Sequence, residues 1–289
     1  MTGSGPAGRL RRARTGGGQP AHHRRDAVHD VVVASVEAGP GRVVARSDGS
    51  TPLDVVMVHG LAVSNRYLVP SLRAFAREHR VFAPDLPGVG RSSKPERKLS
   101  MVELADGLAA WMDVVGVGRA VLVGHSLGCQ VVAQVAARHP DKVAAVILTS
   151  PAPDPGRGPL RKQAWRLVVD GGRERLGMVL IAATDYPRTG IGGILGTLRA
   201  ATRRQAQPDL QSIDRRTLVI RGGRDPLVSA AWADRIAGSI PDARVVTLPN
   251  APHGLPYSAT ADFVAVVHAF VDELDRPDPR PGGSRAGSP

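Results

Sequence analysis

Short apolar runs alternate with amphipathic segments along most of the chain. Several of these runs, such as DVVMVHG and AVLVGHS, are apolar throughout instead of alternating with polar residues. Runs of that kind are typical of strands covered on both faces. The predicted strands are residues 29–37, 41–46, 53–59, 80–83, 120–124, 143–149, 217–221 and 244–248.

Between these runs, apolar residues recur at helical spacing. In the last such segment, Phe263, Val267 and Val271 lie on one face. Ser258 or Thr260 is expected to cap its start. Strands that alternate with helices in this order favour an α/β fold, in which crossover helices join a mostly parallel sheet. The predicted helices are residues 67–78, 100–115, 126–138, 230–239 and 259–274.

Three segments depart from this alternation. Residues 151–212 open with PAPDPGRGP and continue as Arg-rich helical stretches. Because they are too long for a plain loop in a compact domain, we expect a helical lid inserted between two parts of one core, residues 27–150 and 213–275. Residues 1–26 and 276–289 are rich in Gly, Pro, Ser and Arg. We expect both ends to be disordered, since they cannot bury enough apolar surface.

The net charge of +12 raises the question of a nucleic-acid partner. Residues 1–25 contain six Arg and no acid, and residues 151–212 contain ten basic and five acidic residues, so the rest of the body is nearly neutral. Charge blocks at chain ends usually mark solvated segments, so we expect no specific nucleic-acid partner. The alternative is binding of anionic polymers through the Arg-rich ends. It predicts a salt-dependent association that truncation of residues 1–25 removes.

The length of 289 residues and the 42% hydrophobic content allow one substantial core. No run reaches about 18 apolar residues, so no membrane span is expected. The Arg-rich start is not followed by an apolar run, so neither a secretory nor a twin-arginine signal is predicted. Cytoplasmic localisation is expected by default. The single cysteine, Cys129, cannot form an internal disulfide, which agrees with a reducing compartment.

Residues 124–128, GHSLG, match the pattern G-x-S-x-G between a predicted strand and a predicted helix. The chain must turn sharply there, and small residues on either side of the serine avoid collisions with neighbouring backbone. The turn lifts the Ser126 hydroxyl above the sheet. It also places the Leu127 N–H at a helix N-terminus, where it can donate to a developing oxyanion. Ser126 alone would be interpreted as a helix cap, but the strand and helix around it favour a nucleophile.

With this turn, the chain resembles an α/β-hydrolase of the lid-bearing esterase, lipase and carbon–carbon hydrolase group. Four segments match in the order of that family: VVMVHGLAVSNRYLVP, VFAPDLPGVGRSSKP, the GHSLG turn, and GGRDPLV followed by NAPHGLP. The resemblance implies the α/β-hydrolase fold, a mostly parallel eight-stranded sheet with helices on both faces and an inserted helical lid. It also implies that the backbone N–H of Leu61, just after His59 and Gly60, is a second oxyanion donor.

Asp225 and His253 complete a predicted catalytic triad. Asp225 ends the run TLVIRGGRD, where the family's acid commonly sits, and a carboxylate there would hold the imidazole in one tautomer. By itself, Asp225 before Pro226 would be interpreted as the start of a turn. Among nine histidines, only His253 follows both Ser126 and Asp225 in a strand-end loop, because His268 falls inside the final helix. The order Ser, Asp, His is the one expected for this fold.

Other reactive side chains receive other roles. His59 is expected to fix the oxyanion loop by hydrogen bonding, and His125 is the variable position of the turn. Cys129 is interpreted as a small residue that packs in the core, with a reactive thiol as the alternative. His22 and His23 lie in the Arg-rich end, and the chain has no Cys pair and no H-x-x-x-H pattern, so no metal site is expected. The stretch GVGRSS lacks the P-loop form, and no cofactor is expected.

We therefore predict a serine hydrolase that acts on a small to medium apolar ester or related acyl substrate through an acyl-enzyme. Ser126 is the nucleophile, His253 the general base and Asp225 the carboxylate that orients it, while the amides of Leu61 and Leu127 form the oxyanion hole. The expected partner is a small-molecule substrate, and the oligomeric state is left open.

The identity of the substrate is less constrained. The chain holds only three Trp, three Tyr and four Phe, which favours an aliphatic pocket. A serine nucleophile argues against epoxide or haloalkane hydrolysis. A carbon–carbon bond hydrolase or a lactonase with the same triad remains an alternative, and so does a non-catalytic ligand receptor on the hydrolase fold. Lid residues that can face the pocket are Trp165, Met178, Leu180, Ile181, Tyr186 and Leu195.

Overall fold

The computed structural model describes residues 21–40, 52–60, 62–159, 162–163, 165–166, 172, 174–190 and 209–274. These residues form one eight-stranded sheet in the order β1-β2-β4-β3-β5-β6-β7-β8. The pairs β1/β2 and β2/β4 are antiparallel, and the other neighbouring pairs are parallel. The predicted α/β-hydrolase fold with a mostly parallel sheet is confirmed. The strands are β1 (His22–Val28), β2 (Val31–Ala38), β3 (Asp54–Val58), β4 (Val81–Pro84), β5 (Ala120–His125), β6 (Val143–Thr149), β7 (Thr217–Gly222) and β8 (Ala243–Leu248).

Strand β1 corrects the predicted extent of the N-terminal tail. Residues 22–26, expected to be disordered, pair with β2 in antiparallel register. Arg24 forms ion pairs with Asp26 and Glu37 at 3.0 and 3.5 Å. The prediction failed because composition does not reveal that a neighbouring strand supplies hydrogen-bond partners to a polar segment. The predicted strand at residues 41–46 lies outside the described residues.

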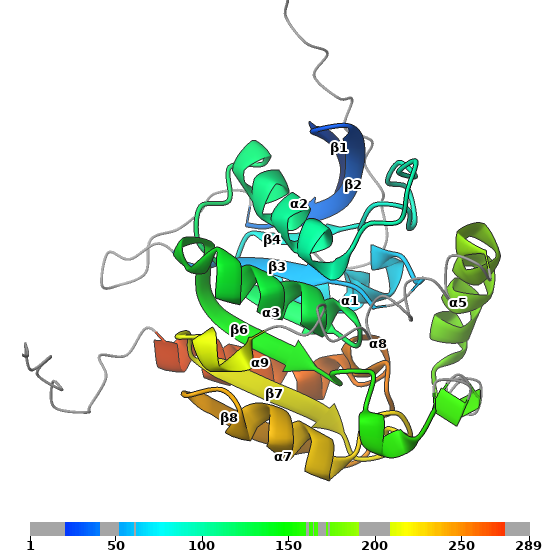
Figure 1. Ribbon diagram of the computed structural model, residues 1–289, viewed down its shortest axis with the longest axis vertical. Helices are drawn as coiled ribbons and strands as arrows, with labels where there is room; N and C mark the ends of the chain where they lie inside the picture. Colours follow the sequence, from blue (N-terminus) through cyan, green and yellow to red (C-terminus); the bar gives the residue numbers. More distant parts are fainter. Residues whose placement is uncertain are drawn as a thin grey trace, which may run out of the picture.

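Helices cover both faces of the sheet (Figure 1). α2, α3 and α7 pack on one face and α1, α8 and α9 on the other, so the sheet separates two apolar cores. Each core lies against strands that are buried along their length, as the continuously apolar runs predict. The helices are α1 (Val69–Phe75), α2 (Met101–Val114), α3 (Gly128–Arg138), α5 (Leu176–Thr189), α7 (Ala230–Gly238), α8 (Leu255–Ser258) and α9 (Thr260–Leu274). Turns of 3₁₀ helix occur at Asn65–Leu68, Pro140–Lys142, Pro155–Arg157 and Leu210–Ser212.

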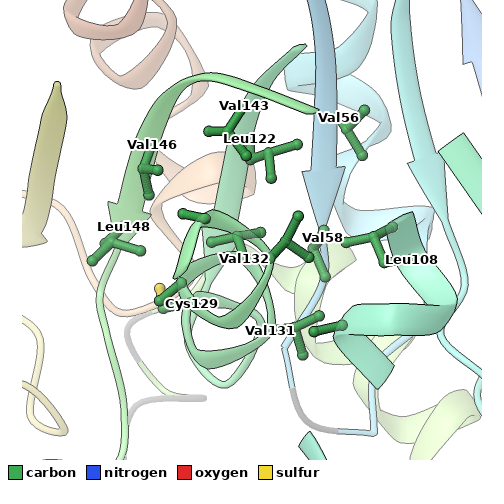
Figure 2. Packing of buried hydrophobic residues seen from close by; sticks show 14 of the residues in the cluster. Val56, Val58, Leu108, Leu122, Cys129, Val131, Val132, Val143, Val146 and Leu148 are labelled. Carbon is green, nitrogen blue, oxygen red and sulfur yellow. The ribbon is translucent and has the colours of Figure 1, made fainter. Parts of the chain in front are cut away.

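Helix α3 is held in the first of these cores. Figure 2 shows its residues Val131 and Val132 beside side chains from β3, β5 and β6, which include Leu122 and Leu148. Full burial of a valine or leucine side chain contributes about 1.5–3 kcal/mol. This packing therefore fixes the start of α3, and with it the turn that carries Ser126.

The segment 151–212, expected to be a lid, is described in part. Its helix α5 stands beyond the carboxyl ends of the parallel strands (Figure 1). Met178, Ile181 and Tyr186 of α5 pack against the core on the α1 and α9 face. Leu176 and Leu180 point away from it, with 73% and 58% of their surface exposed. No helix in the described part of the chain has both the length and the apolar character needed to cross a membrane.

Candidate active site

The turn between β5 and α3 has the shape that a nucleophilic serine requires. Ser126 adopts a left-handed backbone conformation with φ of 53°, which residues other than glycine seldom adopt. A Cβ atom added to Gly124 would lie 2.7 Å from the Cα atom of Cys129, and one added to Gly128 would lie 2.5 Å from the carbonyl oxygen of Val58. The predicted need for small residues at these two positions is confirmed. Strain of this kind concentrates at functional sites.

The structure brings Ser126, Asp225 and His253 together. Each follows the carboxyl end of a parallel strand, β5, β7 and β8 respectively, so all three lie at the same edge of the sheet. His253 Nε2 lies 3.0 Å from Ser126 Oγ, and His253 Nδ1 lies 2.9 Å from Asp225 Oδ2. This arrangement allows a proton to move from the serine hydroxyl to the imidazole.

The carboxylate of Asp225 is built into its loop. Its side chain is fully buried, and Oδ1 accepts hydrogen bonds from the N–H groups of Leu227 and Val228 at 2.7 and 3.1 Å. Burial acts to raise the pKa of Asp225, but the charge of His253 and the hydrogen bonds from His253 and Leu227 outweigh it and lower the pKa. The group is therefore ionised at neutral pH, as needed to stabilise an imidazolium.

His59 fixes the loop that follows β3. Its Nδ1–H donates to the carbonyl oxygen of Gly60 at 2.8 Å, and its Nε2 accepts from the N–H of Leu86 at 2.8 Å. Burial lowers the pKa of His59, which keeps the ring neutral. The predicted loop-fixing role is confirmed. Leu61, the predicted second oxyanion donor, lies outside the described residues.

Two residues that sequence reasoning did not assign to the site lie beside it. The Tyr67 hydroxyl accepts from the N–H of Gly60 at 2.9 Å and lies 2.7 Å from His125 Nδ1. His125 Nε2 lies 3.0 Å from the carbonyl oxygen of His253. His125, interpreted as a variable position of the turn, thus contacts the residue that carries the candidate base. The GHS sequence places it next to the nucleophile, but no local signal gives its partners.

Cys129 is a packing residue. Its thiol is buried and contacts the carbonyl oxygens of Gly124 and Thr149 at 3.3 Å each. Burial raises the pKa of the thiol, so it stays protonated. The packing interpretation is confirmed, and the reactive-thiol alternative is wrong.

Comparison with known proteins agrees with this geometry. Residues 55–178 match the family model of the α/β-hydrolase fold, and residues 197–280 match that of TAP-like proteins. The chain belongs to the α/β-hydrolase superfamily.

Three proteins of known name are similar to this α/β-hydrolase in sequence or in structure. It is 29% identical to the dihydrolipoyllysine-residue acetyltransferase component of the acetoin cleaving system of Pseudomonas putida over 78% of its own length, and it spans only 64% of that protein. It is 28% identical to 2-(acetamidomethylene)succinate hydrolase of Mesorhizobium japonicum over 82% of its length and 94% of the relative. The crystal structure of a membrane phospholipase A superposes with a TM-score of 0.74 at 20% identity, over 89% of this chain and 87% of that one. The last likeness concerns the fold alone.

Two carboxylates of the segment 151–212 bond to loops of the core, one after β3 and one after β8. Asp185 of α5 is buried and accepts from the N–H and hydroxyl of Ser64 at 2.9 and 2.6 Å and from Arg66 at 2.6 Å. Glu174 accepts from the N–H of Gly254 at 2.5 Å and from the hydroxyl of Ser258. These contacts tie the segment to the loop after β3 and to the loop of His253. Neither contact has a local sequence signal.

A separate cavity of about 700 Å³ lies between the β1–β2 turn, the loop after β4 and α2. Val28, Leu99, Leu108 and Trp111 contribute to its apolar lining, and no triad residue is among the described residues that line it. Leu86 links it to His59.

Proposed function

We propose that this α/β-hydrolase is a serine esterase that cleaves a small to medium apolar carboxylic ester through an acyl-enzyme. The observation that carries the proposal is the unbroken line Ser126–His253–Asp225, with contacts of 3.0 and 2.9 Å. The carboxylate and imidazole of this line are buried, whereas Ser126 is only partly buried and so can be reached by a substrate.

In the first half of the reaction, Ser126 Oγ attacks the ester carbonyl carbon while His253 Nε2 takes its proton. The tetrahedral intermediate collapses, the bond to the alkoxy oxygen breaks, and the imidazolium returns the proton to the leaving alcohol. In the second half, His253 takes a proton from a water that attacks the acyl carbon. The bond between this carbon and Ser126 Oγ then breaks, the imidazolium returns the proton to Oγ, and the acid is released. Asp225 stabilises the imidazolium in both halves.

The proposed oxyanion hole consists of two backbone amides. The N–H of Leu127 belongs to the start of α3, where the helix dipole favours negative charge. The N–H of Leu61 is proposed as the second donor. The bond from His59 to the Gly60 carbonyl supports this role, because it fixes the plane of the peptide that Gly60 shares with residue 61.

Contacts of α5 support an apolar substrate. Met178, Ile181 and Tyr186 present a mainly apolar face toward the core, whereas Trp165 and Leu180 are exposed. We therefore assign the first three residues, and not Trp165 or Leu180, to the substrate side of the proposed lid. Leu195 lies outside the described residues.

Turnover of p-nitrophenyl esters of increasing acyl length tests the proposal, with Ser126→Ala as the inactive variant and Ser239→Ala, at a half-buried serine that ends α7, as its control. We expect activity on one or more short to medium esters, a loss on the order of 10³-fold or more in Ser126→Ala, and no change in the control. Labelling with a fluorophosphonate, followed by peptide mapping, should modify Ser126.

A lactone and a β-diketone, added to this series of esters, separate the alternative activities. Turnover of a lactone or a β-diketone without turnover of open esters would replace the esterase by a lactonase or a carbon–carbon hydrolase with the same triad. A chain that binds these compounds but leaves Ser126 unlabelled would be a ligand receptor, and the esterase proposal would be abandoned.

A further inference from the structure

We propose that Tyr67 and His125 are positioning residues that hold the oxyanion loop and the general base of this hydrolase at a fixed separation. The inference rests on the proposed serine-hydrolase function and extends it to residues that do not touch the reacting atoms. The two residues join Gly60, in the loop after β3, to His253, in the loop after β8.

Gly60, Tyr67, His125 and His253 are joined by a series of three hydrogen bonds. The groups at the two ends of this series fix the direction of every bond in it. The carbonyl oxygen of His253 can only accept, so His125 Nε2 carries the hydrogen and donates to it at 3.0 Å. In a neutral imidazole Nδ1 is then an acceptor, and it receives the hydroxyl hydrogen of Tyr67 at 2.7 Å. The N–H of Gly60 can only donate, and it donates to the Tyr67 oxygen at 2.9 Å. The order is therefore Gly60 to Tyr67 to His125 to His253.

The chain of bonds is shielded from water. Tyr67 and His125 are 1% and 4% exposed, and their rings meet edge to face at 5.3 Å between centroids. Burial lowers the pKa of His125 to about 3 and raises the pKa of Tyr67, so both groups stay neutral at neutral pH. Neither residue can turn to water for a replacement partner, and hydrogen bonds in such surroundings are strong.

Gly60 and His253, at the two ends of this series of hydrogen bonds, belong to the loops whose position controls the reaction. A Cβ atom added to Gly60 would lie 3.1 Å from Ser126 Cβ and 3.4 Å from His125 Nδ1, so the oxyanion loop packs directly on the nucleophile. The side chain of His253 is held by Ser126 and Asp225, while its backbone is held by His125. A displacement of about 1 Å at such a centre can lower the rate about 10²-fold.

A network that only stabilises the fold would have different consequences from one that positions catalytic groups. Loss of a stabilising bond lowers the melting temperature and leaves the turnover of the folded enzyme unchanged. Loss of a positioning bond lowers kcat, and it leaves KM nearly unchanged because neither Tyr67 nor His125 is proposed to touch the substrate.

The test uses Tyr67→Phe, His125→Gln and His125→Ala. Gln can still donate to the His253 carbonyl, so we expect it to rescue part of the loss seen with Ala. His79→Gln is the matched control, because His79 is also buried and bonds a backbone carbonyl, that of Leu53, at the opposite end of the strands. We expect kcat to fall about 10- to 100-fold in Tyr67→Phe and further in His125→Ala, with KM within about twofold. The control should keep its kcat.

Variants of Tyr67 or His125 that have a lower melting temperature but retain full kcat would overturn the proposal. A second readout does not depend on turnover: the ¹⁵N spectrum of the histidine rings in the wild-type chain should give His125 as the neutral tautomer protonated at Nε2. Protonation at Nδ1 would also overturn it. If the wild-type chain failed to hydrolyse esters or to react at Ser126, the proposed function would fail. The tautomer of His125 would still test the hydrogen bonds from Gly60 to His253 by themselves.

Discussion

The Cα atom of Gly128 lies against the carbonyl oxygen of Val58, so close that a Cβ atom there would come within 2.5 Å of that oxygen. The carbonyl oxygen of His59 lies 2.6 Å from the same position. Both obstacles are backbone atoms and cannot rotate away. The start of α3 and the end of β3 therefore fit together only when residue 128 lacks a side chain.

This contact predicts the effect of Gly128→Ala. We expect the variant to lose about 1–3 kcal/mol of unfolding free energy, as in overpacked cores, and to lose activity because α3 must shift away from β3. Gly107→Ala is the control, since Gly107 lies inside α2 with no atom near its missing Cβ. There, alanine should stabilise the protein by about 0.5–1 kcal/mol. Urea unfolding of both variants measures the difference, and equal effects would contradict the steric argument.

Asp225→Asn tests the orienting carboxylate. The amide oxygen can keep the bonds from Leu227 and Val228, so we expect a folded protein with a melting temperature near that of the wild type. The amide cannot hold the imidazole in the required tautomer, and kcat should fall on the order of 10⁴-fold. Asp234→Asn, at an exposed site on α7, should behave as wild type. A loss below tenfold in Asp225→Asn would argue against the triad.

The buried histidines predict how stability depends on pH. His125 has a folded-state pKa of about 3 against an unfolded value of 6.5, and the pKa of His59 is also lowered. The unfolded chain therefore binds more protons below pH 6.5. The stability from these neutral rings is fully present above pH 6.5 and is lost as the pH falls toward 3.

The slope that one such histidine adds is at most about 1.4 kcal/mol per pH unit. Urea unfolding between pH 7.5 and 4.5 should give a steeper loss for the wild type than for His125→Gln. Burial raises the pKa of Asp85, which opposes the trend in acid, but this contribution is common to both proteins and cancels in the comparison. Parallel curves would mean that His125 is not held neutral.

Asp185 predicts how α5 is attached. In Asp185→Asn, one of the two oxygens that accept from Ser64 and Arg66 becomes an amide nitrogen that cannot accept. We expect faster tryptic cleavage within residues 151–212 and a higher KM for apolar esters. Asp209→Asn, which alters an exposed cap in the same segment, serves as control. Unchanged cleavage of Asp185→Asn would show that other contacts hold the helix.

Patterns local in the sequence predicted most of the fold and the triad. Continuous apolar runs gave β6 with the bounds that the structure has, and the G-x-S-x-G turn gave the elbow around Ser126. The chain order of Ser, Asp and His left His253 and His268 as candidate bases, and the predicted final helix around His268 selected His253. The apolar runs and the G-x-S-x-G turn are visible because each depends on neighbouring residues, and the order of the three residues is read directly from the chain.

Contacts between distant segments were not predictable. Tyr67 and His125 are 58 positions apart, and Asp185 lies 121 positions from Ser64. Tyrosine, histidine and aspartate are each compatible with many surroundings, so their identity does not specify a partner. Strand β1, whose residues 22–26 were expected to be disordered, was missed for a related reason, since its polar composition hides the pairing with β2.

The position of strand β1 affects how copies of this protein associate. It forms one margin of the sheet, and in the described part of the chain its only pairing neighbour is β2. Unpaired margins of sheets invite strands of other molecules to add on, which leads to aggregation. Charged side chains on a margin disfavour such pairing, and β1 carries three of them, Arg24, Arg25 and Asp26. The charged residues of β1 therefore make this margin a poor partner for the same strand of a second copy.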